Sequence, residues 1–210
     1  MKSKEDKSTI TQSIFDFDLS SGAGLICGVD EAGRGPLAGP VVCAAVVMPY
    51  DTPPIIGIYD SKKVSEKERE RLYLAITQAA ICYKIATIDN HTIDQINILE
   101  ATRRGMEQAI LSLATRPDVI LVDAVKGLKI DRAYSAIISG DQKSYAIAAA
   151  SILAKVTRDN LMKAESLVYP QYGFDSNKGY GTKSHIEAFR KFGKTPIHRT
   201  TFVKNLGEVE

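Results

Sequence analysis

The sequence predicts an α/β layer architecture in which helices flank a mixed β-sheet. Strand-like and helix-like patterns are interleaved along the chain, as in layered α/β folds. The apolar runs LICGV and VVCAAVVM are joined by one short glycine-rich link, so we expect these two strands to pair antiparallel. The chain has 210 residues, of which 44% are hydrophobic, and it is long enough to bury a single core.

Each element follows from a local pattern. Apolar or alternating runs bounded by turn residues predict strands over residues 25–29, 41–48, 81–89, 118–124 and 134–139. Apolar positions at helical spacing, together with an alanine-rich stretch, predict helices over residues 65–80, 92–115 and 143–168. Ser65 and Glu68 form a capping box at the start of the first of these helices. A further helix, TKSHIEAFRKFG, is closed by Gly193.

The domain organisation is simple. Residues 1–24 are polar and end in SSGAG, so we expect a flexible tail or a short capping helix at FDFDL that stays outside the core. Residues 25–210 are expected to form one domain, including a small C-terminal helical part.

Composition narrows the class of protein. The formal net charge of +2 neither requires nor excludes a nucleic-acid partner, so any basic surface must be local. The three cysteines are widely spaced and odd in number, which argues against a disulfide framework or a zinc site and favours a reducing cytoplasm. The N-terminus lacks a signal-peptide core, and the apolar runs are far shorter than the ~20 residues of a membrane helix. We expect a soluble cytoplasmic protein without a membrane partner.

Four acids stand at the ends of predicted strands. Asp30 and Glu31 follow LICGV, Asp123 ends VILV, and Asp141 follows SAIISG. If these strands are neighbours, their carboxylates converge at one edge of the sheet and repel one another unless a cation lies among them. Hard divalent ions such as Mg²⁺ prefer oxygen ligands, and two such ions can activate water against a phosphodiester. For each acid alone, a turn or helix-cap role stays open, and a carboxylate glycosidase is an alternative for the set.

A glycine-rich turn follows the first two acids. Gly33-Arg34-Gly35 has the wrong spacing for a dinucleotide fingerprint and leads into a strand-like run. It offers backbone donors and acceptors beside the acids, with an arginine suited to phosphate. Such a backbone pair can read a ribose 2′-hydroxyl, which distinguishes RNA from DNA.

Six stretches in order resemble the ribonuclease HII family, the type 2 ribonuclease H of bacteria, over residues 25–203. They are GVDEAGRGPLAGPVVCAAVV, DSKKVSEKERERL, LVDA, SGDQKSYAIAAASILAKVTRD, GYGTKSHIEAF and PIHRTTF. The resemblance implies a ribonuclease H-like mixed sheet flanked by helices. It also implies an endonuclease that cleaves the RNA strand of RNA–DNA hybrids and incises 5′ to single ribonucleotides in duplex DNA.

The resemblance assigns roles to individual residues. The four acids would be catalytic and would bind the divalent metal, Mg²⁺ or Mn²⁺, and the GRG turn at residues 33–35 would read the 2′-hydroxyl. Tyr180 of GYGT would stack on the deoxyribose beyond the RNA–DNA junction. Lys62 and Lys155 stand at positions suited to phosphate contact. The three histidines are expected to have structural or phosphate-adjacent roles.

The partners implied are RNA–DNA hybrid and DNA duplex containing ribonucleotides, bound by a monomer. The alternative is a non-catalytic binder of RNA–DNA hybrid. Basic residues in the last part of the chain could supply the local positive face that a duplex needs: Lys178, Lys183, Arg190, Lys191, Lys194, Arg199 and Lys204.

Overall fold

A five-stranded sheet forms the centre of the fold in the computed structural model, which describes residues 6–207. Its strands are β1 (Ile26–Ala32), β2 (Val41–Met48), β3 (Cys82–Ile88), β4 (Val119–Asp123) and β5 (Ser135–Ile137), in the order β3-β2-β1-β4-β5. β1 pairs antiparallel with β2 and parallel with β4. The predicted antiparallel pair and mixed sheet are confirmed.

Helices cover both faces of this sheet. The longer ones are α1 (Lys7–Leu19), α2 (Glu66–Ala79), α3 (Asn90–Leu111), α4 (Tyr145–Val168) and α6 (Lys183–Phe192). The short ones are α5 (Phe174–Asn177), α7 (Thr200–Val203) and the 3₁₀ turns η1 (Ser61–Lys63), η2 (Gly140–Gln142) and η3 (Pro170–Tyr172). The predicted helices agree with α2, α3, α4 and α6 to within a few residues at each end.

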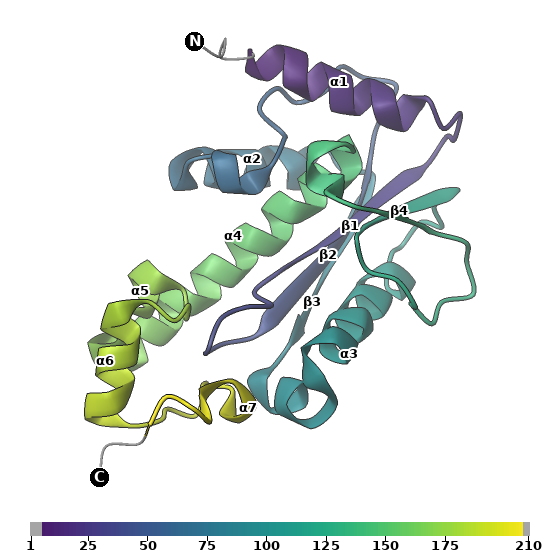
Figure 1. The fold of residues 1–210 in the computed structure, drawn as a ribbon. Coiled ribbons are helices and arrows are strands. Elements are labelled where there is room, and N and C mark those ends of the chain that lie inside the picture. The colour runs from purple at the N-terminus through teal and green to yellow at the C-terminus, as the bar shows by residue number, and fades with distance from the viewer. Residues whose placement is uncertain (1–5, 208–210) are drawn as a thin grey trace.

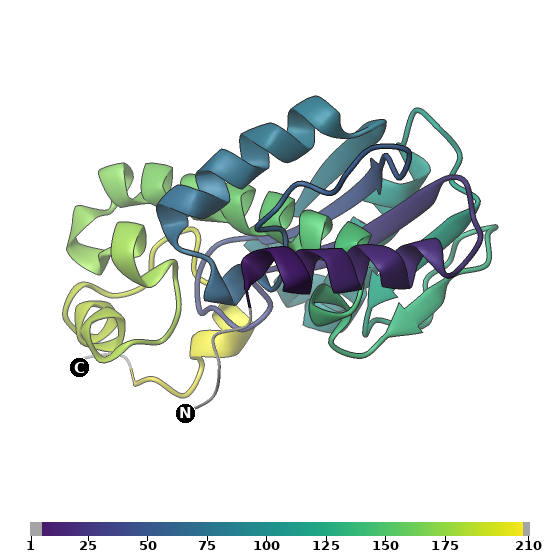
Figure 2. The same ribbon diagram turned by 90° about the horizontal axis from the view of Figure 1, so that it is seen from above.

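β2 is buried on both sides, because its alternate side chains enter two different cores. Val42, Ala44 and Val46 pack with α4, α2 and α1, whereas Cys43 and Ala45 pack with α3. This two-sided burial explains why the strand reads as a continuous apolar run in the sequence. Figures 1 and 2 show α4 and α3 on opposite faces of the strands.

α1 differs from the loose tail or short capping helix predicted for residues 1–24. It is a 13-residue helix whose Ile14 and Phe15 belong to the core. Asp18, which is buried, accepts hydrogen bonds from the Tyr50 hydroxyl (2.5 Å) and from the N–H of Ala146 in the first turn of α4 (2.8 Å). Burial of two apolar residues and this polar link fix the segment, although its composition is polar overall.

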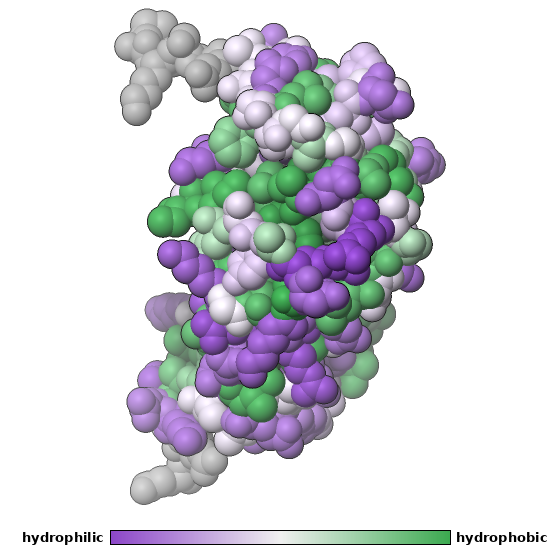
Figure 3. All heavy atoms as spheres, turned by 90° about the vertical axis from the view of Figure 1, so that its right-hand side faces the viewer, coloured by the Kyte–Doolittle hydropathy of each residue, from purple (hydrophilic) through white to green (hydrophobic). Residues whose placement is uncertain are grey.

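The cysteines, the helix hydropathy and the surface show no disulfide and no membrane-spanning helix among residues 6–207. All three cysteines are free thiols. Among residues 6–207, no helix combines the length and the apolar character that a bilayer crossing requires. Figure 3 shows hydrophilic side chains interspersed with smaller apolar patches on the face at the right of Figure 1.

Candidate active site

Parallel pairing brings the acids of β1 and β4 to the same edge of the sheet. Val29 lies opposite Val122, so Asp30 and Asp123, each one position further on, lie at the same level. β1 continues through Asp30 and Glu31 to Ala32, beyond the predicted strand end at residue 29. Asp30, Glu31 and Asp123 line one cleft of about 330 Å³.

Asp141 lies beside this cleft, outside its lining. It is buried in η2, and the N-cap of α4 is Ser144, so Asp141 does not cap that helix. The N–H of Gly140 donates a 2.6 Å hydrogen bond to Asp123 Oδ1, which ties the turn that carries Asp141 to the end of β4. Left-handed backbone at Ser139 (φ 56°) precedes this turn, a strained conformation of the kind that concentrates at functional sites.

Burial and the charges of neighbouring acids disfavour the charged forms of Asp30, Glu31 and Asp141. Burial, with the charges of Glu31 and Asp123, raises the pKa of Asp30 well above its usual range. Burial raises the pKa of Glu31 to about 7, against the opposing effect of Arg34. Burial also raises the pKa of Asp141. These groups would be stabilised as anions by a cation placed among them.

The oxygen atoms present suit a hard divalent ion. Glu31 Oε2 is buried and has no hydrogen-bond partner among residues 6–207. Carboxylate oxygens are the ligands that Mg²⁺ and Mn²⁺ prefer. In the part of the chain that the structure describes, no group of three or more His, Cys, Asp or Glu side chains is arranged to bind one metal ion. Three features therefore make these residues suitable for a divalent ion: their carboxylate oxygens, the unpartnered Glu31 Oε2 and the repulsion among neighbouring acids.

The GRG turn forms another part of the cleft lining. Gly33 has φ 98°, a left-handed conformation that favours glycine. Arg34 Nη1 lies 3.6 Å from Glu31 Oε1, so the cation of the turn faces one of the acids. Tyr180 also lines the cleft, is 43% exposed and lies next to Gly35. The turn and the tyrosine thus adjoin the carboxylates.

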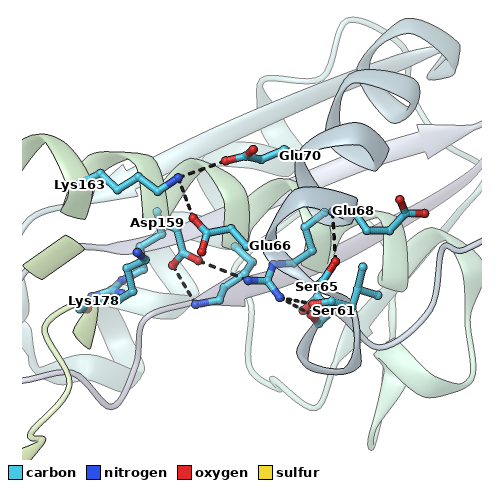
Figure 4. Close-up of polar contacts among 12 residues, drawn as sticks. Ser61, Ser65, Glu66, Glu68, Glu70, Asp159, Lys163 and Lys178 are labelled. Carbon is cyan, nitrogen blue, oxygen red and sulfur yellow. Dashed lines mark hydrogen bonds and ion pairs between the residues drawn. The ribbon is translucent and has the colours of Figure 1, made fainter. Parts of the chain in front are cut away.

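Lys62 and Lys155 both line the cleft, and each contacts an acid. Lys62 Nζ lies 3.8 Å from Asp141 Oδ2. Lys155 Nζ lies 2.8 Å from Asp159 Oδ1, and the same carboxylate lies 3.8 Å from Arg69. Figure 4 shows Asp159 within this group of charges, with Ser61 further along the same set of dashed contacts. The acid partners hold the two lysines at the border of the cleft.

A chain of contacts leads from this charged group to Asp30. Arg69 Nη1 donates to the carbonyl oxygen of Ser61 at 3.0 Å. The hydroxyl of Ser61 lies 2.8 Å from that of Ser151, and the Ser151 side chain opposes the rise in the pKa of Asp30 that burial causes. Ser61 and Ser151 line the cleft, yet sequence reasoning did not single them out. The sequence could have indicated them, since Ser61 lies in DSKK and Ser151 in SILAK, two of the stretches that carry the family resemblance.

Two members of the predicted basic face are buried instead. Arg199 is fully buried and Lys178 is 9% exposed, so neither belongs to an exposed positive surface. Arg199 lies where the C-terminal segment meets the GRG turn. Arg158 of α4, which sequence reasoning missed, is likewise buried and lines the cleft. Charge alone indicated a surface role for Arg199 and Lys178, whereas the fold buries both side chains.

The histidines lie away from the carboxylates. His185 and His198 are buried, with their Nε2 atoms 3.1 Å apart, and His91 is exposed. His185 Nδ1 lies 2.8 Å from the carbonyl oxygen of Tyr180, and His198 Nδ1 accepts from the N–H of Thr195 at 3.0 Å. The buried pair joins the Tyr180 segment to the C-terminal segment, a structural role.

Solved structures define the class of protein. The "ribonuclease H2" from Pyrococcus horikoshii is 28% identical, with a TM-score of 0.74 over 87% of this chain and 96% of that chain. The "Bst-RNase HIII in complex with Mn²⁺" shares the fold alone, with 18% identity and a TM-score of 0.60 over 80% of this chain and 63% of that chain. A ribonuclease H-type sheet with acids at the carboxyl ends of its parallel strands makes this protein a nuclease of the ribonuclease H class.

The family follows from the sequence comparisons. The profile of the family "Ribonuclease HII" matches residues 27–205. The "Ribonuclease HII" of Ruminiclostridium cellulolyticum is 55% identical over 190 residues, which are 90% of this chain and 74% of that protein. The chain belongs to the ribonuclease HII family, whose members are metal-dependent endonucleases that cleave the RNA strand of RNA–DNA hybrids.

Proposed function

We propose that this protein incises duplex DNA on the 5′ side of a single embedded ribonucleotide, as well as cleaving longer RNA–DNA hybrids. The products would carry 3′-hydroxyl and 5′-phosphate ends. One observation supports this proposal above the others. Asp30, Glu31 and Asp123 share a single cleft with the GRG turn and Tyr180. Groups for hydrolysing a phosphodiester and groups for reading a ribose therefore adjoin each other.

The four acids would hold the divalent ions, Mg²⁺ or Mn²⁺. Bound ions of this kind supply an activated water and stabilise the charge that develops on the phosphate. Asp30 and Asp123 lie level on neighbouring strands, and Glu31 and Asp141 flank them. Ser151, whose side chain lowers the pKa of Asp30 against the effect of burial, would stabilise that carboxylate as an anion. The described residues offer no histidine beside these acids, so proton removal from water would not use an imidazole.

The remaining cleft residues would position the nucleic acid. Lys62 and Lys155 would contact phosphates, since their ammonium groups lie at the cleft border. Tyr180, exposed beside Gly35, would stack on the deoxyribose after the ribonucleotide. The backbone of residues 33–35 would bind the 2′-hydroxyl.

A second, basic groove supports contact with an extended duplex. It lies between α6 and α7, and its cationic lining residues are Arg190, Lys191, Lys194 and Lys204. Cationic side chains of this kind bind the phosphate backbone without regard to sequence. We propose that residues 25–210 act as one catalytic domain, as a cytoplasmic monomer on hybrid or ribonucleotide-containing duplex, with α1 packed against it.

The test uses one labelled DNA duplex containing a single ribonucleotide, beside its all-DNA counterpart. With Mg²⁺ or Mn²⁺ we expect a nick 5′ to the ribonucleotide and an intact control duplex, and excess EDTA should abolish the nick. Comparing the two ions at matched concentrations identifies the preferred metal. Mapping the product ends by ligation and phosphatase treatment checks the 3′-hydroxyl and 5′-phosphate.

Two outcomes would contradict the proposal. Cleavage that persists in excess EDTA would rule out the metal-dependent mechanism. Tight binding of the duplex without any nick would indicate a binding protein. Asp131→Asn serves as the matched control for Asp30→Asn, because the Asp131 side chain is 76% exposed and lies outside the cleft. It should cleave like the parent.

A further inference from the structure

Two buried arginines lie beneath the GRG turn and are explained by no role described so far. Arg158 is 1% exposed and Arg199 is fully buried. Burying a guanidinium is costly unless its donors are satisfied, and an acid usually supplies the partner. Within residues 6–207 neither arginine forms an ion pair. Each is satisfied by backbone carbonyl oxygens instead.

Arg199 binds three carbonyls of the loop that joins β1 to β2. Its Nη2 donates to Gly33 at 2.6 Å, its Nη1 to Arg34 at 2.8 Å and its Nε to Gly39 at 3.0 Å. The planar fork of a guanidinium suits several carbonyls at fixed relative positions. One side chain from the C-terminal segment therefore sets the shape of the turn.

Arg158 binds a second set of carbonyls from the other side. Its Nε donates to Pro40 at 2.9 Å, its Nη2 to Ala38 at 3.1 Å and its Nη1 to Lys178 at 2.9 Å. Its guanidinium carbon also lies 5.9 Å from the centre of the Tyr180 ring. Arg158 thereby joins the loop between β1 and β2 to the segment that carries Tyr180.

The glycine of the turn permits this close approach. A Cβ added at Gly33 would lie 2.0 Å from Arg158 Nε and 2.8 Å from the carbonyl oxygen of Pro40. Such contacts are not tolerated, so a side chain at position 33 would displace the arginine. The identity of Gly33 and the burial of Arg158 are therefore parts of one packing arrangement.

Peptide geometry links Arg199 to the cleft. In a trans peptide the C=O of one residue and the N–H of the next point in opposite directions, and residues 6–207 contain no cis peptide. Because the carbonyls of Gly33 and Arg34 point at Arg199, the N–H groups of Arg34 and Gly35 point away from it. Neither N–H has a partner within residues 6–207, and both residues line the cleft.

We infer that Arg199 is a positioning residue for ribose recognition, with Arg158 as its supporting partner. By holding two consecutive carbonyls, Arg199 turns the N–H groups of Arg34 and Gly35 toward the cleft as a preformed donor pair for an oxygen of the ribonucleotide. This inference rests on the proposed function, since it specifies how the GRG turn distinguishes ribose from deoxyribose. Arg199 itself does not touch the substrate.

The test compares binding of two duplexes in Ca²⁺, in place of the catalytic ion, by the parent, Arg199→Gln and Arg199→Lys. One duplex contains a single ribonucleotide and the other is all DNA. Lysine keeps the charge, but its ammonium cannot span the carbonyls of Gly33, Arg34 and Gly39 together. Both variants should lose the preference for the ribonucleotide by about tenfold, the effect of one or two hydrogen bonds. Affinity for the all-DNA duplex should stay within about twofold.

A second readout keeps the inference testable if Arg199→Gln fails to fold. In the amide spectra of the parent and of Arg199→Lys, the signals of Arg34 and Gly35 should move on adding the ribonucleotide duplex only in the parent. Arg103→Gln is the matched control, because Arg103 Nε donates to the carbonyl of Lys126 at 2.8 Å, outside the cleft. It should keep the parental preference.

The outcomes separate this inference from the proposed function. If a folded Arg199→Lys keeps the parental preference, or if both duplexes lose affinity by the same factor, the inference is wrong. The proposed function then still stands, provided that the parent nicks the ribonucleotide duplex. A parent that neither nicks it nor prefers it contradicts the proposed function itself.

Discussion

The guanidinium of Arg199 donates a 2.6 Å hydrogen bond to the carbonyl oxygen of Gly33, a residue 166 positions earlier in the chain. Gly33 lies two residues after Glu31, at the edge of the cleft. Arg199 thus links the C-terminal segment directly to the candidate active site. Contacts around the acids, the histidine pair and the packing of α4 on β1 each lead to an expected outcome.

Asp30→Asn should abolish cleavage and at the same time stabilise the metal-free protein. Burial and the charges of Glu31 and Asp123 raise the pKa of Asp30, so its anion opposes folding at neutral pH. An amide keeps an oxygen that can accept from the N–H of Glu31. We expect the free energy of unfolding in EDTA at about pH 8 to rise by about 1 to 2 kcal/mol. Urea denaturation measures this, and a loss of stability would contradict it.

Metal binding should strengthen as the pH rises through neutrality. Glu31 has a pKa of about 7, raised chiefly by burial, so protons compete with the ion below that value. Calorimetry in buffers of different ionisation enthalpy should detect protons released on binding Mg²⁺ or Mn²⁺. Arg34 lowers the pKa of Glu31, so in Arg34→Gln the rise of metal affinity with pH should occur at higher pH than in the parent. An affinity independent of pH between about 6 and 8 would contradict this account.

Acidification should destabilise the protein through His198. Burial and the neighbouring His185 lower the pKa of His198 to about 4, whereas an unfolded histidine has a pKa of about 6.5. The unfolded state therefore binds the proton first, and stability present above about pH 6.5 is lost as the pH falls toward 4. We expect His198 to account for about 2 to 3 kcal/mol of this loss.

The measurement is the free energy of unfolding between about pH 7 and 4.5 for the parent, His198→Asn and His91→Gln. His198→Asn should show a shallower dependence on pH, even if it is less stable at pH 7. His91 is exposed, so His91→Gln should follow the parent. Equal slopes for the parent and His198→Asn would show that another group controls the acid response.

Gly28→Ala should destabilise the fold, because α4 lies directly against β1 at this glycine. A Cβ there would lie 2.0 Å from the carbonyl carbon of Ala146 and 2.1 Å from its oxygen. Both are backbone atoms, so relief requires shifting the helix, and we expect a loss of about 3 kcal/mol. Gly24→Ala is the control, since the nearest atom to its added Cβ is a side-chain oxygen of Asp118, at 3.3 Å, and not a backbone atom. Urea denaturation of both variants measures the difference. If Gly28→Ala is as stable as Gly24→Ala, the prediction is wrong.

Much of the fold could be predicted because its signals are local. The apolar run at 41–48 coincides with β2, and the capping box at Ser65 marks the start of α2. The antiparallel pairing of the first two strands followed from the short link between them. α1 was underestimated, because the burial of its core residues, Ile14 and Phe15, is apparent only against α4 and its neighbours.

The sequence by itself determined the strands, the main helices and the positions of the acids and the GRG turn along the chain. Tertiary structure alone decided that Arg158 and Arg199 are buried against carbonyls of the β1–β2 loop, and that His185 and His198 form a pair. The physical reason is the range of the interactions. Propensity, capping and periodicity act between near neighbours, whereas a buried guanidinium is placed by carbonyls that only the completed fold brings to it.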